Sequence, residues 1–174
     1  MKTVLLMNNP LALHITRFVV LILAQVFIFD NIHLFGFISP FVYILFLLLY
    51  PVKVNQQLFL FLGFLLGLTM DFFSDTGGIH AASCLMLAYA RPAVLKYSFG
   101  VSYEYNTIKI NHTTMSGRLT YISSLVVLHH LIFYTLEIFN IKHTLFILKS
   151  ALFSSIFTIL LSLILMIIFS TKKS

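Results

Sequence analysis

Charged residues are scarce in this sequence, since 9% of its 174 residues are Asp, Glu, Lys or Arg and 60% are hydrophobic. Soluble globular domains average about 25% charged residues, so this composition, with a mean hydropathy of +1.01, excludes one. A hydrocarbon core about 30 Å thick needs roughly 20 apolar residues per helix, which leaves room for about six spans. Long apolar runs favour helices over barrel strands. We therefore predict an all-α integral membrane protein without a separate soluble domain.

Cysteine is almost absent as well. The single Cys84 lies in an apolar segment, which excludes an intrachain disulfide and a cysteine-based metal framework; we expect it to pack as a small side chain. Catalytic motifs are also missing: the sequence has no rhomboid-type GxSx, YD/GxGD aspartate pair, HExxH, Walker A loop or dinucleotide fingerprint. We expect no enzymatic activity, no cofactor, no metal and no nucleic-acid partner.

Six apolar segments are the predicted spans, in one domain. Their expected bounds are 15–29, 37–50, 58–73, 79–98, 119–139 and 145–169. The first is expected to be retained rather than cleaved, because no small-residue cleavage site follows it. Residues 32–39 fit either an irregular connection packed against protein or the start of the second helix, with Pro40 early in it. Pro92 predicts a break or kink after Arg91, and residues 107–110 a short strand edge.

The distribution of Lys and Arg predicts the orientation. With both termini cytoplasmic, nine basic residues lie inside, and only Lys142 and Lys149 lie outside. This asymmetry follows the positive-inside rule. Asp30, Asp71, Asp75 and Glu137 would then gather at the outer face, and Glu104 would remain inside.

The stretch 63–91 is a predicted helical hairpin. Gly63, Gly67 and Asp71 recur every four residues and share one helical face, and the two glycines form a small-xxx-small pattern that lets another helix approach closely. Asp71 is expected to face protein, the alternative being a helix end among headgroups. Gly77 and Gly78 suit a tight turn. Asp75 or Thr76 is the expected cap of the next helix.

Three polar patterns leave alternatives open. His80 with Asp71 and Asp75 suggests acid-base or metal chemistry, although a histidine in the first helical turn that bonds the turn backbone fits better. His130, Tyr134 and Glu137 share a helix face and could form a proton path, a seam between helices or a partner-binding face. A stripe of hydroxyls favours helix packing over a solute path; it consists of Ser150, Ser154, Thr158 and Ser162.

The hairpin residues also carry a family resemblance. The segment GLTMDFFSDTGGIHA at 67–81, followed by Tyr89-Ala90-Arg91-Pro92, resembles the signature hairpin of the rod shape-determining protein MreD family. FFSDTGGIHAAS, with His129 and His130 ahead of Glu137, is similar to the Bacteroidetes-type branch. The residues that the resemblance singles out, as partner-binding or as structural parts of the hairpin, are Gly63, Gly67, Asp71, Gly77, Gly78, His80, Tyr89 and Arg91.

The resemblance implies a non-catalytic scaffold of the bacterial cell-elongation complex in the inner membrane. Such a subunit is expected to bind an MreC-like membrane protein, and through it MreB, RodA and the penicillin-binding partner of RodA, besides membrane lipid. We expect the partner's transmembrane helix to dock on a groove of small residues. The family is also similar in architecture to the six-helix substrate-binding subunits of energy-coupling-factor transporters. The alternative function is therefore binding of a vitamin-like solute.

Overall fold

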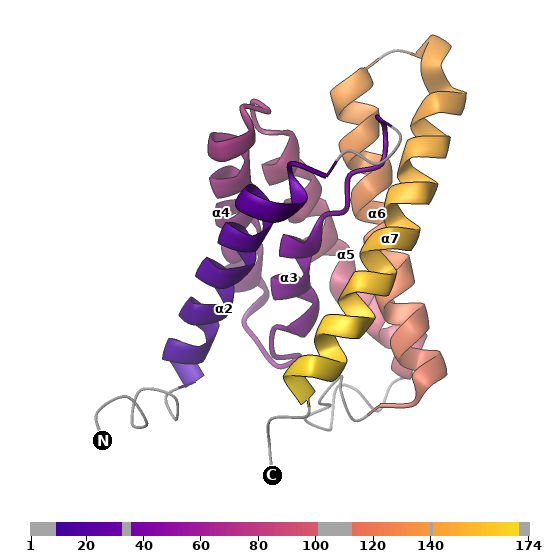
Figure 1. Ribbon diagram of the computed structural model, residues 1–174. Helices are drawn as coiled ribbons and strands as arrows, with labels where there is room; N and C mark the ends of the chain where they lie inside the picture. The colour runs from indigo at the N-terminus through magenta and orange to yellow at the C-terminus, as the bar shows by residue number, and fades with distance from the viewer. Residues whose placement is uncertain (1–9, 33–35, 101–112, 140, 171–174) are drawn as a thin grey trace.

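A computed structural model describes residues 10–32, 36–100, 113–139 and 141–170 (Figure 1). The described part is helical, apart from turns and one irregular stretch before α3. In chain order, the helices are α2 (Pro10–Ala24), the π-helical turn η1 (Gln25–Phe29), the 3-10 turn η2 (Val42–Ile44), α3 (Leu45–Leu49), α4 (Gln56–Ser74), α5 (Ile79–Phe99), α6 (Met115–Ile138), the 3-10 turn η5 (Ile141–His143) and α7 (Thr144–Ser170). The expected strand at 107–110 and Glu104 lie outside the described residues.

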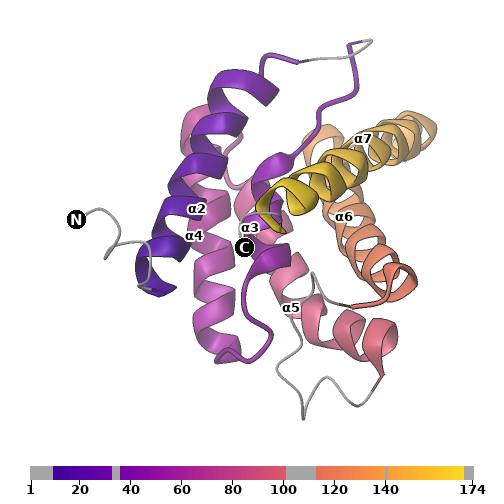
Figure 2. The same cartoon turned by 60° about the horizontal axis from the view of Figure 1, so that its bottom comes forward.

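The long helices form a bundle around the short α3. Helix α2 lies beside α4 on one side, α6 and α7 pair on the other, and α5 lies behind α3 between them (Figures 1 and 2). The start of α2 and the end of α7 are at the same end of the bundle, whereas the α4–α5 turn is at the opposite end. Within the described residues, four helices are long and apolar enough to cross a membrane: Leu11–Phe29, Gln56–Ser74, Met115–Ile138 and Thr144–Ile167. The chain is therefore a multi-pass, all-α membrane protein by length and composition.

Helices α4 and α5 form the predicted hairpin. The turn between them uses left-handed backbone at Asp75, Gly77 and Gly78, with φ of 52°, 62° and 103°, as expected for a glycine-rich tight turn. The face with Gly67 lies directly against α5: a Cβ added to Gly67 would be 2.5 Å from the Cα of Ala81. At Gly63 the same atom would be 3.1 Å from Ala88 Cβ. The face with Gly63 and Gly67 is thus occupied by the chain's own α5, so these two glycines do not line a groove that is open to a partner helix. Docking of a partner helix elsewhere stays a prediction.

The second predicted span is only partly helical. Helix begins at Val42 and ends at Leu49, and residues 38–41 have no regular helical structure. Pro40 precedes the helix instead of lying in its first turn. Residues 41–48 are nonetheless buried, each exposed by 4% or less. This segment is therefore the irregular stretch packed against protein that the sequence left open, followed by a short buried helix.

Pro92 does not break the fourth predicted span, because α5 continues through it to Phe99. Proline lacks the N–H that would bond the carbonyl four residues earlier, which here belongs to Ala88. The side chain of Gln56 replaces that donor, since its Nε2 donates to the Ala88 carbonyl at 3.1 Å. A hydrogen bond from α4 thus satisfies the carbonyl that the proline leaves free. Of the expected break or kink, the break is wrong, and the kink stays a prediction.

The other helix bounds differ from the predicted spans mainly at their starts. The first helix begins at Pro10 rather than at 15, α4 at Gln56 rather than at 58, and α6 at Met115 rather than at 119. Two of these starts have a side-chain cap. Asn55 accepts from the N–H of Gln57 at 2.8 Å, and the Thr114 hydroxyl accepts from that of Gly117 at 3.3 Å. Because a polar capping residue satisfies the first N–H groups, the helix can begin ahead of its apolar run.

The contact at Gly67 predicts a graded effect of added methyl groups. We expect Gly67→Ala to lower stability by about 1–3 kcal/mol, because the new Cβ meets backbone that cannot move aside, whereas Gly63→Ala should cost less. Reversible unfolding in mixed micelles measures both. Equal stability of the two variants would contradict this account of the α4–α5 contact.

Candidate functional site

Asp71 holds the hairpin together from inside. Its side chain is 7% exposed, and its two carboxylate oxygens accept from the backbone N–H groups of His80 at 2.9 Å and Ala81 at 2.8 Å. The Thr76 hydroxyl also donates to this carboxylate. Asp71 thus caps α5 from the preceding helix, in the place expected for Asp75 or Thr76. A carboxylate there also interacts favourably with the helix dipole.

Gln25 caps the short central helix, which consists of η2 and α3. It lies in the π-helical turn η1 and is fully buried. Its Oε1 accepts from the N–H groups of Val42 at 2.7 Å and Tyr43 at 3.3 Å, while its Nε2 donates to the Pro40 carbonyl at 3.1 Å and to Asp30 at 2.8 Å. One side chain therefore satisfies backbone groups on both sides of the point where this helix begins. The sequence alone did not predict this role for Gln25.

Tyr43 is the centre of a buried polar cluster at the start of this helix. Its hydroxyl lies 2.7 Å from His80 Nδ1 and 2.9 Å from His129 Nε2, and 3.8 Å from the sulfur of Cys84. All four residues are exposed by 2% or less. The cluster joins the central helix to α5 and α6. His80 lies in the first turn of α5 as expected, but its ring bonds Tyr43 rather than the turn backbone.

The proton positions in this cluster follow from the one ring nitrogen that has no partner. His129 Nδ1 is buried and makes no hydrogen bond within the described residues. An unpaired buried N–H is more costly than an unpaired lone pair, so we assign the His129 proton to Nε2. It then donates to the Tyr43 oxygen, and the Tyr43 hydroxyl donates to His80 Nδ1. The hydrogen bonds therefore all run in one direction, from His129 through Tyr43 to His80, and all three residues are buried.

His130 and Tyr134 belong to a second network, which runs sideways from α6 to α7. His130 Nδ1 donates to the Val126 carbonyl at 2.9 Å, so its Nε2 accepts from the Thr158 hydroxyl at 3.2 Å. The hydroxyl of Tyr134 meets Ser154 Oγ at 2.7 Å. Apart from the bond of His130 to Val126 within α6, these bonds of His130 and Tyr134 cross to α7, and Glu137 is exposed. For His130 and Tyr134 the arrangement is an interhelical seam, one of the three alternatives that the sequence left open.

The hydroxyls of α7 satisfy the irregular backbone before the central helix. Ser154 Oγ accepts from the Ser39 N–H at 3.1 Å, and Thr158 Oγ1 from the Phe41 N–H at 3.0 Å. The stripe is buried at all four of its positions. Ser154 and Thr158 also bond Tyr134 and His130 of α6. These two hydroxyls therefore join α7 to α6, in agreement with the favoured interpretation of helix packing.

Arg91 closes the other end of the central helix. It is 2% exposed; Nε donates to the Tyr121 hydroxyl at 2.8 Å, Nη1 donates to the Pro51 carbonyl at 3.2 Å, and Nη2 donates to that of Tyr50. Tyr121 in turn donates to the Leu48 carbonyl at 3.1 Å. A cation beside the last carbonyls of a helix satisfies them and interacts favourably with the dipole. Tyr89, two residues earlier, is on the outside and 69% exposed.

Most of the buried polar groups described above are thus hydrogen-bonded within the chain, whereas His129 Nδ1 and the hydroxyls of Ser150 and Ser162 have no partner among the described residues. Among the residues described, no group of three or more His, Cys, Asp or Glu side chains is placed to hold a metal ion. Asp75 is exposed in the turn, and the described Asp71, Asp75 and His80 do not form a group that could hold a metal ion. The chemistry that these contacts support is hydrogen bonding of backbone and side chains inside a membrane bundle.

Comparison with known proteins gives no matching family model, curated protein or solved structure.

The cap formed by Asp71 can be tested with two amide substitutions. Asp71→Asn should lower stability by about 1–2 kcal/mol, because an NH₂ replaces one of the oxygens that accept backbone N–H groups. Asp75→Asn is the matched control: it is exposed, and asparagine tolerates the left-handed backbone found there. Unfolding in mixed micelles gives both values. A loss at Asp75 as large as that at Asp71 would refute the cap.

The polar cluster around Tyr43 leads to a second prediction about stability. Tyr43→Phe removes one hydroxyl and leaves His80 Nδ1 and His129 Nε2 without their partner, so we expect a loss of roughly 2–4 kcal/mol, at one to a few kcal/mol per unsatisfied buried group. Tyr89→Phe removes an exposed hydroxyl of the same kind and should be close to neutral. Thermal unfolding of both proteins decides the point, and a wild-type melting temperature for Tyr43→Phe would count against the assigned network.

Proposed function

We propose that this protein is a non-catalytic scaffold subunit of a bacterial cell-elongation complex, as its MreD-like hairpin implies. Its partner is an MreC-like membrane protein, and through it the chain is connected to MreB, RodA and the penicillin-binding partner of RodA. Its role is to help position peptidoglycan synthesis and so control cell shape.

The supporting observation is what the signature residues do in the fold. Gly67 allows α4 and α5 to touch, Asp71 caps α5, and His80 and Arg91 bond the two ends of the central helix. Residues that a catalyst would direct at a substrate are here hydrogen-bonded within the chain. Such internal bonding favours a rigid fold, which the proposed scaffold role needs.

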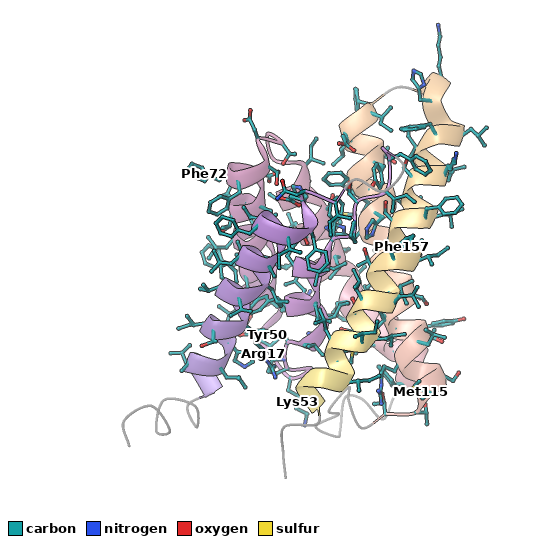
Figure 3. The ribbon with its side chains drawn as sticks, in the orientation of Figure 1. Arg17, Tyr50, Lys53, Phe72, Met115 and Phe157 are labelled. Atoms are coloured by element: carbon teal, nitrogen blue, oxygen red, sulfur yellow. The ribbon has the colours of Figure 1, made fainter. Side chains whose placement is uncertain are left out.

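The same proposal includes a topology. Helix α5 and the segment 36–49 lie within the bundle beside the four apolar helices, so we propose six membrane crossings, the second of them through irregular backbone and α3. Both termini are then cytoplasmic, and the membrane is the bacterial inner membrane. Arg17 and Lys53 lie at the end that would face the cytoplasm, and Phe72 lies at the other (Figure 3).

One observation favours the alternative, a subunit that binds a vitamin-like solute. Transporters commonly build midplane sites from interrupted helices, and the segment 36–49 is interrupted within the bundle next to the Tyr43 cluster. In this chain the freed backbone groups of that segment are bonded to Gln25, Ser154 and Thr158. Such internal bonding favours the scaffold over the solute binder.

The partner interaction gives a testable prediction at Tyr89, the signature side chain that is left at the surface. Tyr89→Ala should reduce recovery of an MreC-like protein in a detergent pull-down by roughly tenfold, because an exposed aromatic of this size is a typical anchor of an interface. Tyr97→Ala, on the same helix and 81% exposed, is the control and should leave recovery unchanged. The bound proteins are identified by mass spectrometry.

The wild-type pull-down has its own decisive outcomes. Recovery of an MreC-like protein, with rounding of rod-shaped cells when the chain is depleted, supports the scaffold. Recovery of no elongation protein, together with a small molecule that remains bound through purification, would replace it with the solute binder.

A further inference from the structure

Arg91 is a buried cation without an acidic partner among the residues described. It donates to three neutral oxygens, those of Tyr50, Pro51 and Tyr121, and its charge also lies over the ring of Phe59 at 4.5 Å. A guanidinium has five N–H donors. Three of them are used within the described residues, so one hydrogen on each terminal nitrogen is available there to a further acceptor.

The described acids lie at the opposite end of the bundle. Asp71 is bonded to the N–H of His80, and 11 residues of α5 separate His80 from Arg91, a distance of about 16 Å along the helix. Glu137 is 16 residues from Tyr121 on α6, about 24 Å. Asp30 is bonded to Ser74 beside the hairpin turn. The charge of Arg91 is therefore stabilised by the carbonyls at the end of the central helix, and no carboxylate of the described residues lies close to it.

Arg91 also lines a cavity. The cavity has a volume of about 380 Å³, is only partly enclosed, and is bounded by Val52, Val54, Gln56, Arg91, Pro92 and Leu95. It lies at the end of the bundle where Arg17 and Lys53 are found (Figure 3). A partly apolar cavity with one buried guanidinium at a membrane boundary suits a group with a negative head and an apolar body.

We propose that this cavity binds a phosphate-bearing anion through the free N–H groups of Arg91. Arginine is suited to phosphate because its N–H donors match the spacing of two phosphate oxygens. The phosphate comes either from the headgroup of an anionic lipid or from a small soluble phosphate. This binding is independent of the elongation-complex proposal, since it needs no protein partner.

The test leaves Arg91 in place, because its removal would also uncap the central helix. Val54→Phe adds a ring to the cavity wall, and Val52→Phe does the same from the neighbouring position if the first variant fails to fold. Val19→Phe, at a 45% exposed position on α2, is the matched control. Each full-length protein is purified in detergent, and its melting temperature without additives establishes that it is folded.

Binding is then measured by native mass spectrometry with dioleoylphosphatidylglycerol, with dioleoylglycerol, which has the same acyl chains but no phosphate, and with inorganic phosphate. We expect phosphatidylglycerol to bind roughly tenfold more tightly than dioleoylglycerol, as one charge-assisted hydrogen bond to the phosphate would give. Val54→Phe should remove that preference, and Val19→Phe should keep it.

Each result has a fixed meaning. A preference lost in Val54→Phe and kept in Val19→Phe supports a lipid headgroup. Binding of inorganic phosphate that Val54→Phe removes, without a lipid preference, supports the same site with a soluble ligand. Equal binding of the two lipids with no phosphate binding, or a lipid preference that survives Val54→Phe, overturns the proposal. A failed pull-down of elongation proteins would leave these outcomes unaffected.

Discussion

Peptide groups that are buried in a membrane without helical partners must be bonded by other parts of the protein, because lipid offers no hydrogen bonds. The segment 36–49 imposes this requirement in the middle of the bundle. Gln25 and Thr158 supply partners where its helix begins, and Arg91 and Tyr121 supply them where it ends. Four different helices thus converge on one short stretch, and their relative positions are set by the bonds that it needs.

The α4–α5 hairpin obeys the same requirement at its own turn. The first N–H groups of α5 have no helical partner, and Asp71 reaches them from α4. That reach depends on close packing, which Gly67 permits. The residues that resemble a family signature are therefore coupled: the glycine brings two helices together, and the acid bonds across the gap. A scaffold benefits from such coupling because its function depends on a fixed shape.

Much of the fold could be predicted from the residues. Apolar runs indicated helices near their observed places, and the spacing of Gly63, Gly67 and Asp71 indicated that one face of α4 meets protein. The hydroxyl spacing on α7 indicated packing. The prediction failed where a distant side chain changes a local rule. Pro92 predicts a break or kink, but the helix continues and Gln56 bonds the carbonyl that the proline frees. Asp75 or Thr76 was the expected cap of α5, but Asp71 accepts from its first N–H groups.

By itself, then, the sequence determined the environment and the helical class, because hydrophobicity and helical period are local properties that read directly from the chain. It also determined which helix faces carry small or polar residues. Only the tertiary structure decided the partners of those residues. Tyr43 meets His129 across 86 positions, and Thr158 meets Phe41 across 117. Such contacts depend on how helices are placed in space, and no periodicity in one segment encodes the segment that it will face.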